Sequence, residues 1–174
     1  MKRLALLCGA VLLFAGFASA QDESPRIEVF GGYSFVRANT DGVGYNFNGG
    51  SGSLDYNVTP WLGVVADFGG YHWSQTGVDA TVVTYLFGPK VALRRGPITP
   101  FAQVLFGGAH ASGSSNTFGT GSVNSFAMTV GGGVDWNATE HIGIRLVQAE
   151  YLMTQFSSQT QNNARISTGV VFRW

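Results

Sequence analysis

His110 and Ser112 are the two side chains whose types and spacing come nearest to a catalytic pair in this sequence. A histidine beside a serine can take the hydroxyl proton and make the oxygen a nucleophile for acyl transfer. Such a pair also needs an acid that orients the imidazole. The next acids along the chain are Asp135 and Glu140, and the strand pattern described below places both at the opposite end of the molecule. The sequence therefore favours a structural position for His110 and keeps acyl transfer as an alternative.

Metal and cofactor chemistry is not predicted. His72 and His141 are expected at opposite rims of the fold, so the three histidines form no obvious metal site. Cys8 is the only cysteine and lies in an N-terminal apolar stretch. The glycine run at 131 to 133 lies within a predicted strand and precedes no helix, which argues against phosphate binding. We therefore expect no cofactor.

Isolated charges recur at positions that could face a barrel interior. These positions are Glu28, Asp67, Lys90, Asp135, Arg145, Glu150, Arg165 and Arg173. Their signs nearly balance, and a barrel of eight strands is only wide enough inside for its own side chains. The pattern predicts an ion-paired plug rather than a general diffusion pore. The neighbouring pair Arg94 and Arg95 is expected at a solvated turn or against lipid headgroups.

The elements that carry these residues alternate with a period of two, as strands with two different faces do. The clearest segment is the last one, where Ile166, Val170 and Phe172 share a face opposite Arg165 and Arg173. We predict eight antiparallel strands in an all-β, up-and-down transmembrane barrel with lipid outside and polar side chains inside. Their ranges are 26 to 37, 46 to 57, 62 to 73, 80 to 93, 100 to 111, 124 to 136, 142 to 156 and 164 to 174.

The seventh predicted strand breaks the alternation. If Arg145 faces inward, strict alternation puts Gln148 and Glu150 outside in lipid. We therefore predict a β-bulge near Val147 that shifts the side-chain register by one residue.

Connections between the predicted strands alternate in length. Those at 57 to 61, 94 to 99 and 137 to 141 are short, and those at 38 to 45, 74 to 79, 112 to 123 and 157 to 163 are longer. Short periplasmic turns and longer outer loops are typical of outer-membrane barrels. Trp61, Trp136 and Trp174 are then expected as interfacial aromatics at the periplasmic rim, with Trp73 and Tyr71 at the outer rim.

The first twenty residues have the features of a secretory signal peptide. Lys2 and Arg3 precede an apolar stretch, and Ala18 to Ala20 offers a cleavage site near Ala20. Residues 21 to 174 then form one domain, with eight basic residues against ten acidic ones. This near-neutral balance argues against nucleic-acid binding.

The chain resembles the OmpA/OmpX-like family of small, porin-like outer-membrane β-barrels. The resemblance rests on the signal peptide, the segment VFGGYSF at Val29 to Phe35, and the final GVVFRW. In that family, a terminal aromatic residue with apolar residues at alternate positions is similar to the signal that the barrel-assembly machinery reads. Val170, Phe172 and Trp174 match that pattern.

The resemblance implies a bacterial outer-membrane protein of the cell envelope that contacts outer-membrane lipid, lipopolysaccharide and, during insertion, the assembly machinery. We expect a monomeric, non-enzymatic barrel with a structural or surface-interaction role. Two alternatives stay open. One is an outer-membrane lipid A-modifying acyl hydrolase, because His110 and Ser112 resemble the His-x-Ser of lipid A deacylases. The other is a soluble β-barrel that binds an apolar ligand inside.

Overall fold

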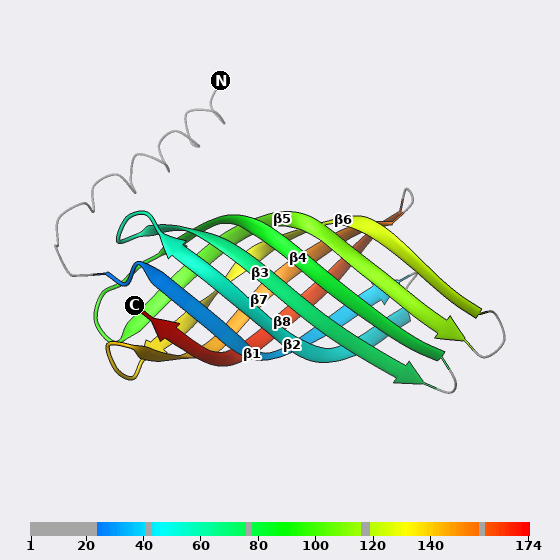
Figure 1. The fold of residues 1–174 in the computed structure, drawn as a ribbon, viewed down its shortest axis with the longest axis horizontal. Helices are drawn as coiled ribbons and strands as arrows, with labels where there is room; N and C mark the ends of the chain where they lie inside the picture. Colours follow the sequence, from blue (N-terminus) through cyan, green and yellow to red (C-terminus); the bar gives the residue numbers. More distant parts are fainter. Residues whose placement is uncertain (1–23, 41–42, 76–77, 116–118, 157–158) are drawn as a thin grey trace, which may run out of the picture.

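The chain folds into a closed barrel of eight antiparallel strands (Figure 1). The computed structural model describes residues 24–40, 43–75, 78–115, 119–156 and 159–174. The strands are β1 (Ile27–Thr40), β2 (Val43–Asn57), β3 (Leu62–Gln75), β4 (Val78–Ala92), β5 (Ile98–Ser115), β6 (Gly119–Asn137), β7 (Ile142–Phe156) and β8 (Gln159–Arg173). Each pairs with its neighbours in sequence, which confirms the predicted all-β, up-and-down architecture. None of the described residues belongs to a helix long and apolar enough to cross a membrane.

The first and last strands close the barrel. Glu28 pairs with Arg173 in the β1–β8 register, and the ladder runs on to Arg37 and Ala164. At its end, the Ile27 N–H donates to the Trp174 carbonyl at 3.0 Å, and the Trp174 N–H donates back at 2.9 Å. This ladder, from Glu28 to Arg37 on β1, closes the sheet into a ring and leaves no free sheet edge over its length.

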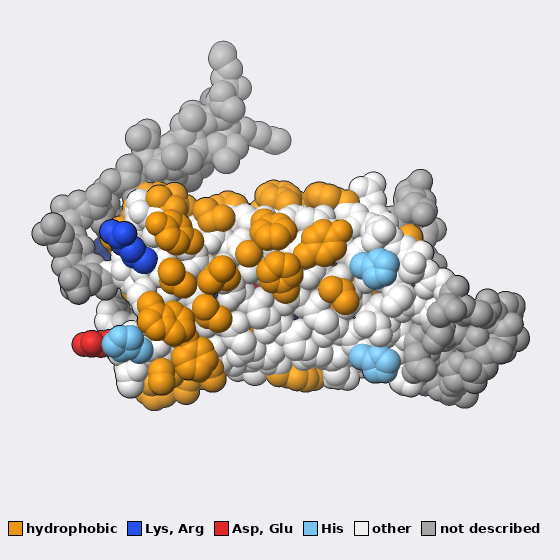
Figure 2. Space-filling view, in the orientation of Figure 1, with side chains coloured by type: hydrophobic (Ala, Val, Ile, Leu, Met, Phe, Trp, Pro, Cys, Tyr) orange, Lys and Arg blue, Asp and Glu red, His pale blue; other side chains and the backbone are white. Residues whose placement is uncertain are grey.

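Side chains alternate between a lipid-type outer face and a polar interior in the part of the barrel nearest the termini. Large apolar residues such as Phe68, Phe87 and Phe172 lie outside with 44–52% of their surface exposed. Figure 2 shows apolar side chains gathered over the half of the barrel nearest the termini and only sparsely at the far end. An exposed apolar band of this kind is expected where the solvent is hydrocarbon.

The predicted bulge in β7 is confirmed. The pairing of β7 with β8 shifts between Arg145 and Gln148. Leu146 and Val147 consequently both point outward, whereas Arg145 and Gln148 are both buried. The extra residue lets the strand return its later polar side chains to the interior.

The three short connections lie at the terminal end of the barrel, where β1 begins and β8 ends (Figure 1). Two of them share one construction, in which a threonine hydroxyl accepts the N–H of the first residue of the next strand. Thr59 accepts from Leu62, and Thr139 accepts from Ile142, each at 3.0 Å. In the third, Gly96 has a φ of 76°, a backbone conformation that glycine adopts without steric cost.

The predicted long loops at the other end are largely strand, which corrects the expected contrast in length. The segment predicted as a loop at 112 to 123 is divided between β5, which runs to Ser115, and β6, which begins at Gly119. The other three long connections are shortened in the same way by strand extension. Residues 41–42, 76–77, 116–118 and 157–158, between the strands, lie outside the described part of the chain.

The two faces exchange character in this far part of the barrel, which we name the distal extension (described residues of 36–48, 71–84, 109–125 and 152–163). Exposed polar side chains cover its outside, among them Asn46, Asn48, His72, Thr81, Ser122, Asn124 and Asn162. Its inside is largely apolar and includes Val36, Phe47, Tyr71, Val82, Ala109, Ala111 and Leu152. The distal extension therefore has the side-chain pattern of a barrel surrounded by water. The rest of the barrel has the pattern of one surrounded by lipid.

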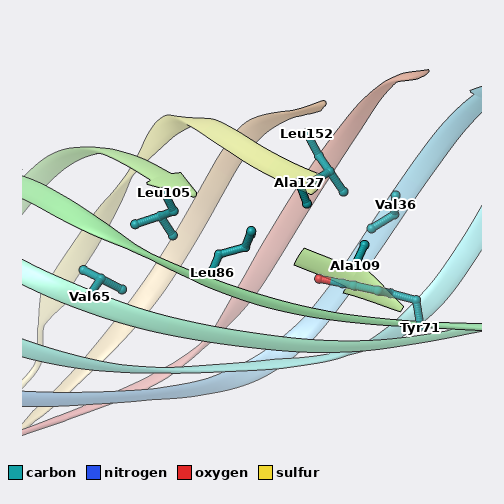
Figure 3. Close-up of a cluster of buried hydrophobic side chains, with 8 residues drawn as sticks. All are labelled: Val36, Val65, Tyr71, Leu86, Leu105, Ala109, Ala127 and Leu152. Carbon is teal, nitrogen blue, oxygen red and sulfur yellow. The ribbon is translucent and has the colours of Figure 1, made fainter. Parts of the chain in front are cut away.

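Two aromatic residues predicted at the outer rim lie on the inner face instead. Tyr71 is only 2% exposed and belongs to the buried apolar cluster of Figure 3. Trp73 lies two residues further along the same face of β3, where it packs edge-on against Tyr45 at 5.4 Å between ring centroids. The prediction of Trp73 as an interfacial aromatic is therefore wrong, because the face reversal places aromatic side chains inside the distal extension.

Candidate functional site

The interior of the barrel near the termini holds a continuous network of ion pairs. All eight predicted interior charges are buried, with at most 4% of their surface exposed: Glu28, Asp67, Lys90, Asp135, Arg145, Glu150, Arg165 and Arg173. Inward-facing positions of every strand contribute, since β2 adds Asp55 and β5 adds Gln103. The alternation of the strands is what brings these distant residues together.

Glu28 is the most connected carboxylate at the terminal end. Its Oε2 lies 3.1 Å from the Lys90 ammonium and 3.3 Å from the Arg94 guanidinium. Its Oε1 accepts from Arg173 Nε at 3.1 Å. Lys90 also donates to Asp55 at 2.5 Å. One acid thus joins cations from two strands and a turn.

The network then crosses the interior from β8 to β7 through Asp135. Arg173 lies 3.3 Å from Asp135 Oδ2, and Arg145 Nε donates to Asp135 Oδ1 at 2.8 Å. The Arg145 guanidinium is held between two interior rings, 4.3 Å from the centre of Phe30 and 4.4 Å from the centre of Phe101. Such stacking is attractive because the ring faces carry negative charge density.

Arg165 forms the part of the network nearest the middle of the barrel. Its guanidinium contacts Glu150 Oε2 at 2.6 Å and donates to Asp67 Oδ1 at 2.7 Å. It also donates to the Tyr71 hydroxyl at 3.1 Å. Gln148 links this group to the previous one, because it accepts from Arg145 at 2.7 Å and donates to Glu150 at 2.8 Å.

Charge in the network is balanced. Its cations are Lys90, Arg94, Arg145, Arg165 and Arg173, five in all, and its carboxylates are Glu28, Asp55, Asp67, Asp135 and Glu150, also five. Balanced, mutually hydrogen-bonded charges offset the high cost of removing each ion from water. Chemically, the arrangement fills the interior and holds the strands together, and it presents no free nucleophile.

Two members of the network were missed by the sequence reasoning. Asp55 was not among the predicted interior charges, and Arg94 was predicted at a solvated turn or lipid headgroup. The structure instead directs Arg94 back to Glu28, to the Asn57 side chain at 2.9 Å and to the Pro60 carbonyl. Arg94 reaches the network from the turn between β4 and β5, which a strand-by-strand reading does not cover.

A repeat in the sequence could have identified Asp55. Asp55-Tyr-Asn-x-Thr-x-x-Leu-Gly and Asp135-Trp-Asn-x-Thr-x-x-Ile-Gly share one spacing. In each copy the aspartate enters the network and the threonine makes the turn. The asparagine of each copy, Asn57 or Asn137, accepts a hydrogen bond from an arginine, Arg94 or Arg173.

The other predicted aromatics lie on the outer face. Trp61, Trp136 and Trp174 are 42–63% exposed at the end of the barrel that holds the termini. In the predicted assembly signal, Val170 and Phe172 precede Trp174 on the same outer face. Val170, Phe172 and Trp174 can therefore contact lipid or another protein.

His110 and Ser112 lie on the outside of the distal extension, on the same face of β5. The His110 ring is paired through Nδ1 with the amide oxygen of Asn124 at 2.7 Å. Of the acids the sequence offered, Asp135 is buried in the network and Glu140 lies in the turn before β7. The ring is thus oriented by an amide and not by a carboxylate, which gives the acyl-transfer alternative no geometric support.

Histidines and acids do not gather into a candidate metal centre within the described ranges. His72 lies on the outer face of β3, 3.2 Å from the Thr81 hydroxyl, and His141 lies in the turn before β7. The two histidines are therefore at opposite ends of the barrel.

Comparisons with known proteins identify the family. The family model of the outer membrane protein β-barrel domain matches residues 6–173. Neisserial surface protein A (NspA) has a similar solved structure, with a TM-score of 0.75 and 13% identity over 88% of this chain and 100% of that one. The attachment invasion locus protein Ail of Yersinia pestis gives a TM-score of 0.60 and 16% identity, covering 86% and 99% of the two chains. No curated protein sequence is significantly similar.

The N-terminal β-barrel domain of Pseudomonas aeruginosa OprF is also similar, with a TM-score of 0.54 and 14% identity over 86% of this chain and 100% of that one. At such identities these structures establish a shared fold only. The family match covers nearly the whole chain. The protein belongs to the outer membrane protein β-barrel family, which implies a place in the bacterial outer membrane.

Proposed function

We propose that this protein is a closed, non-enzymatic barrel that serves the outer membrane as a structural component and presents its distal extension at the cell surface. The observation that carries this proposal is the ion-paired network. It draws side chains from all eight strands into the interior, where a diffusion pore would need open space.

The network resists opening because its charges depend on one another. Moving Arg165 aside would leave Asp67 and Glu150 buried without their cation. Breaking a buried pair of this kind costs about 3–5 kcal/mol. A solute that entered from the terminal end would have to disrupt several such pairs in succession. We therefore expect the barrel to conduct neither ions nor sugars at a useful rate.

Conductance tests the closed interior. The purified protein is inserted into planar lipid bilayers, and a general porin in the same membranes serves as the positive control. We expect no conductance steps from this barrel at voltages where the porin conducts. Regular steps that scale with protein concentration would refute the closed interior.

Cysteine labelling in intact cells tests the surface presentation. In a Cys8→Ser background, Asn124→Cys places one thiol on the outside of the distal extension, and Ala138→Cys places one in a turn at the terminal end. Both residues are exposed. We expect a membrane-impermeant maleimide to label Asn124→Cys in intact cells and Ala138→Cys only after the outer membrane is permeabilised. The reverse pattern would contradict the proposed orientation.

A further inference from the structure

A polar pocket of about 290 Å³ opens at the terminal end of the barrel. We name it the mouth pocket. Its lining includes two arginines, two threonines, one asparagine and one carboxylate: Arg94, Arg173, Thr99, Thr139, Asn137 and Glu140. They belong to the terminal ends of β5, β6 and β8 and to the turns after β4 and β6. Groups that donate hydrogen bonds therefore dominate its wall.

Both arginines of the mouth pocket have N–H groups to spare. Glu28 holds the two guanidinium groups near each other, with Oε2 3.3 Å from Arg94 Nη2 and Oε1 3.1 Å from Arg173 Nε. Each guanidinium has five N–H groups. The described contacts leave one unused on Arg94 Nη1 and one on each terminal nitrogen of Arg173. Both side chains line the pocket and keep some exposed surface, 13% for Arg94 and 5% for Arg173, so a ligand there can contact them.

Thr139 adds a further donor at the opening of the pocket. Its oxygen accepts the Ile142 N–H at 3.0 Å, and no described contact uses its hydroxyl proton. The residue is exposed, so that proton is available to a ligand. Two guanidinium groups and a hydroxyl around one opening suit a carboxylate, because each carboxylate oxygen accepts hydrogen bonds.

Charge is unevenly distributed within the ion-paired network, although its total is balanced. The described ion pairs fall into two groups that share no ion pair. The group next to the mouth pocket, which we name the terminal group, has four cations and three carboxylates: Lys90, Arg94, Arg145, Arg173, Glu28, Asp55 and Asp135. The group in the middle of the barrel has one cation, Arg165, and two carboxylates, Asp67 and Glu150. The terminal group therefore has an excess of one positive charge.

We propose that the mouth pocket binds the carboxylate of a small, singly charged solute. One negative charge matches the excess of the terminal group, and a guanidinium binds a carboxylate through paired N–H groups. Glu140 also lines the pocket, is exposed and has no ion pair within the described ranges, so it disfavours a second negative charge on the ligand. In the proposed orientation the pocket opens to the periplasm. That location rests on the proposed function, whereas the site itself does not.

A lipid headgroup is the competing source of a single negative charge. Thr99 and Arg173 line the pocket from the inner face of the barrel. Their neighbours in sequence, Ile98 and Phe172, are exposed on the outer face, where lipid lies. The wall of strands thus stands between the bilayer and the pocket, which favours a ligand that comes from water.

Binding of fluoroacetate to the full barrel in phosphatidylcholine nanodiscs tests the site by ¹⁹F NMR. Uncharged fluoroacetamide has nearly the same shape and is the control ligand. We expect saturable binding of fluoroacetate and affinity at least about tenfold lower for the amide, because charge-assisted hydrogen bonds are the stronger ones. Equal affinity for both ligands, or no saturable binding of fluoroacetate, would overturn the proposal. So would displacement of fluoroacetate by dihexanoyl-phosphatidylglycerol but not by dihexanoyl-phosphatidylcholine, which would assign the pocket to a headgroup.

Three substitutions locate the binding site. Arg94→Gln should lower fluoroacetate affinity at least about tenfold. Arg95→Gln removes the same charge in the same turn but outside the described lining, so it should change the affinity less than about twofold. Glu140→Gln should raise the affinity about three- to fivefold by removing a like charge.

Two results would contradict this location. One is an effect of Arg94→Gln no larger than that of Arg95→Gln. The other is an unchanged affinity in Glu140→Gln, which alters no described contact and therefore tests the site even if Arg94→Gln does not fold. None of these measurements depends on conductance or on the orientation of the barrel in cells.

Discussion

Replacing Arg165 with methionine should strongly destabilise the barrel. Arg165 contacts Asp67 at 2.7 Å and Glu150 at 2.6 Å, and all three side chains are at most 1% exposed. Methionine fills a similar space but leaves both carboxylates buried without a cation. Removing one partner of a buried ion pair costs about 3–5 kcal/mol. With a urea dependence of about 2 kcal/mol per molar, the unfolding midpoint should fall by about 1.5–2.5 M.

Urea unfolding of the folded barrel in lipid vesicles measures this shift, with tryptophan fluorescence and the gel mobility of unheated samples as readouts. Arg37→Met is the matched control, because Arg37 is exposed and its guanidinium bonds only to Asn46 among the contacts described. The free energy of unfolding of Arg37→Met should differ from that of the wild type by less than about 0.5 kcal/mol.

A triple variant separates charge from packing. Combining Arg165→Met with Asp67→Asn and Glu150→Gln removes the uncompensated charges while it retains the side-chain volumes. We expect the triple variant to recover at least half of the lost stability, because exchanging a buried ion group for neutral residues is often close to neutral. If Arg165→Met changes stability by less than about 1 kcal/mol, or the triple variant is no more stable than the single one, the reasoning about the network is wrong.

Three further changes test other parts of the structure. Val170→Arg, on the apolar outer face, should lower the folding stability in vesicles by about 2–4 kcal/mol. Asn162→Arg, on the same face of β8 but within the distal extension, should change the stability little. Equal effects of the two substitutions would contradict the face reversal. Deleting Val147 removes the extra residue of the bulge and leaves Arg145, Gln148 and Glu150 in strict alternation, so the heat-modifiable folded form should persist, as it should in a Leu146→Ala control; loss of that form in the deletion alone would show that the barrel needs the bulge. Thr139→Ala should cost about 0.5–1.5 kcal/mol in urea unfolding by leaving the first N–H of β7 without its acceptor, and an unchanged midpoint would mean that water replaces the hydroxyl.

Most of the membrane part of this fold could be predicted because every strand there except β7 keeps one regular alternation of inward and outward side chains. Alternation placed Asp67, Lys90 and Arg165 on the inner face, and its failure in β7 located the bulge near Val147. A misplaced register would put a charge into lipid, so the sequence is under a strong physical constraint at these positions.

The distal extension could not be predicted in the same way. Ser112 to Val123 consists largely of Gly, Ser, Asn and Thr, residues that are typical of loops. These residues form strand because β5 and β6 continue to pair with each other up to Ser115 and Gly119. Trp73 was misplaced for a related reason, since a single rule of apolar outside and polar inside does not hold along the whole of β3.

Interior partners were equally hard to predict. Periodicity tells which face a side chain occupies but not which side chain lies across the barrel from it. The contact between Glu28 and Lys90 joins residues 62 positions apart, and that between Arg165 and Asp67 joins residues 98 apart. Arg94 was missed because turn residues have no alternating face at all.

The paired seam between β1 and β8 makes the starting point of the chain arbitrary with respect to the fold. Since Ile27 and Trp174 exchange two hydrogen bonds, a short linker could join the ends, and the chain could be opened instead in the turn between Ala92 and Ile98. Such a circular permutant keeps every strand pair but moves Val170, Phe172 and Trp174 away from the end of the polypeptide. If it folds in detergent yet fails to reach the membrane in cells, delivery depends on a sequence at the chain end and folding on the order of strands around the ring. The sequence that directs delivery to the membrane would then be separable from the strand order that directs folding.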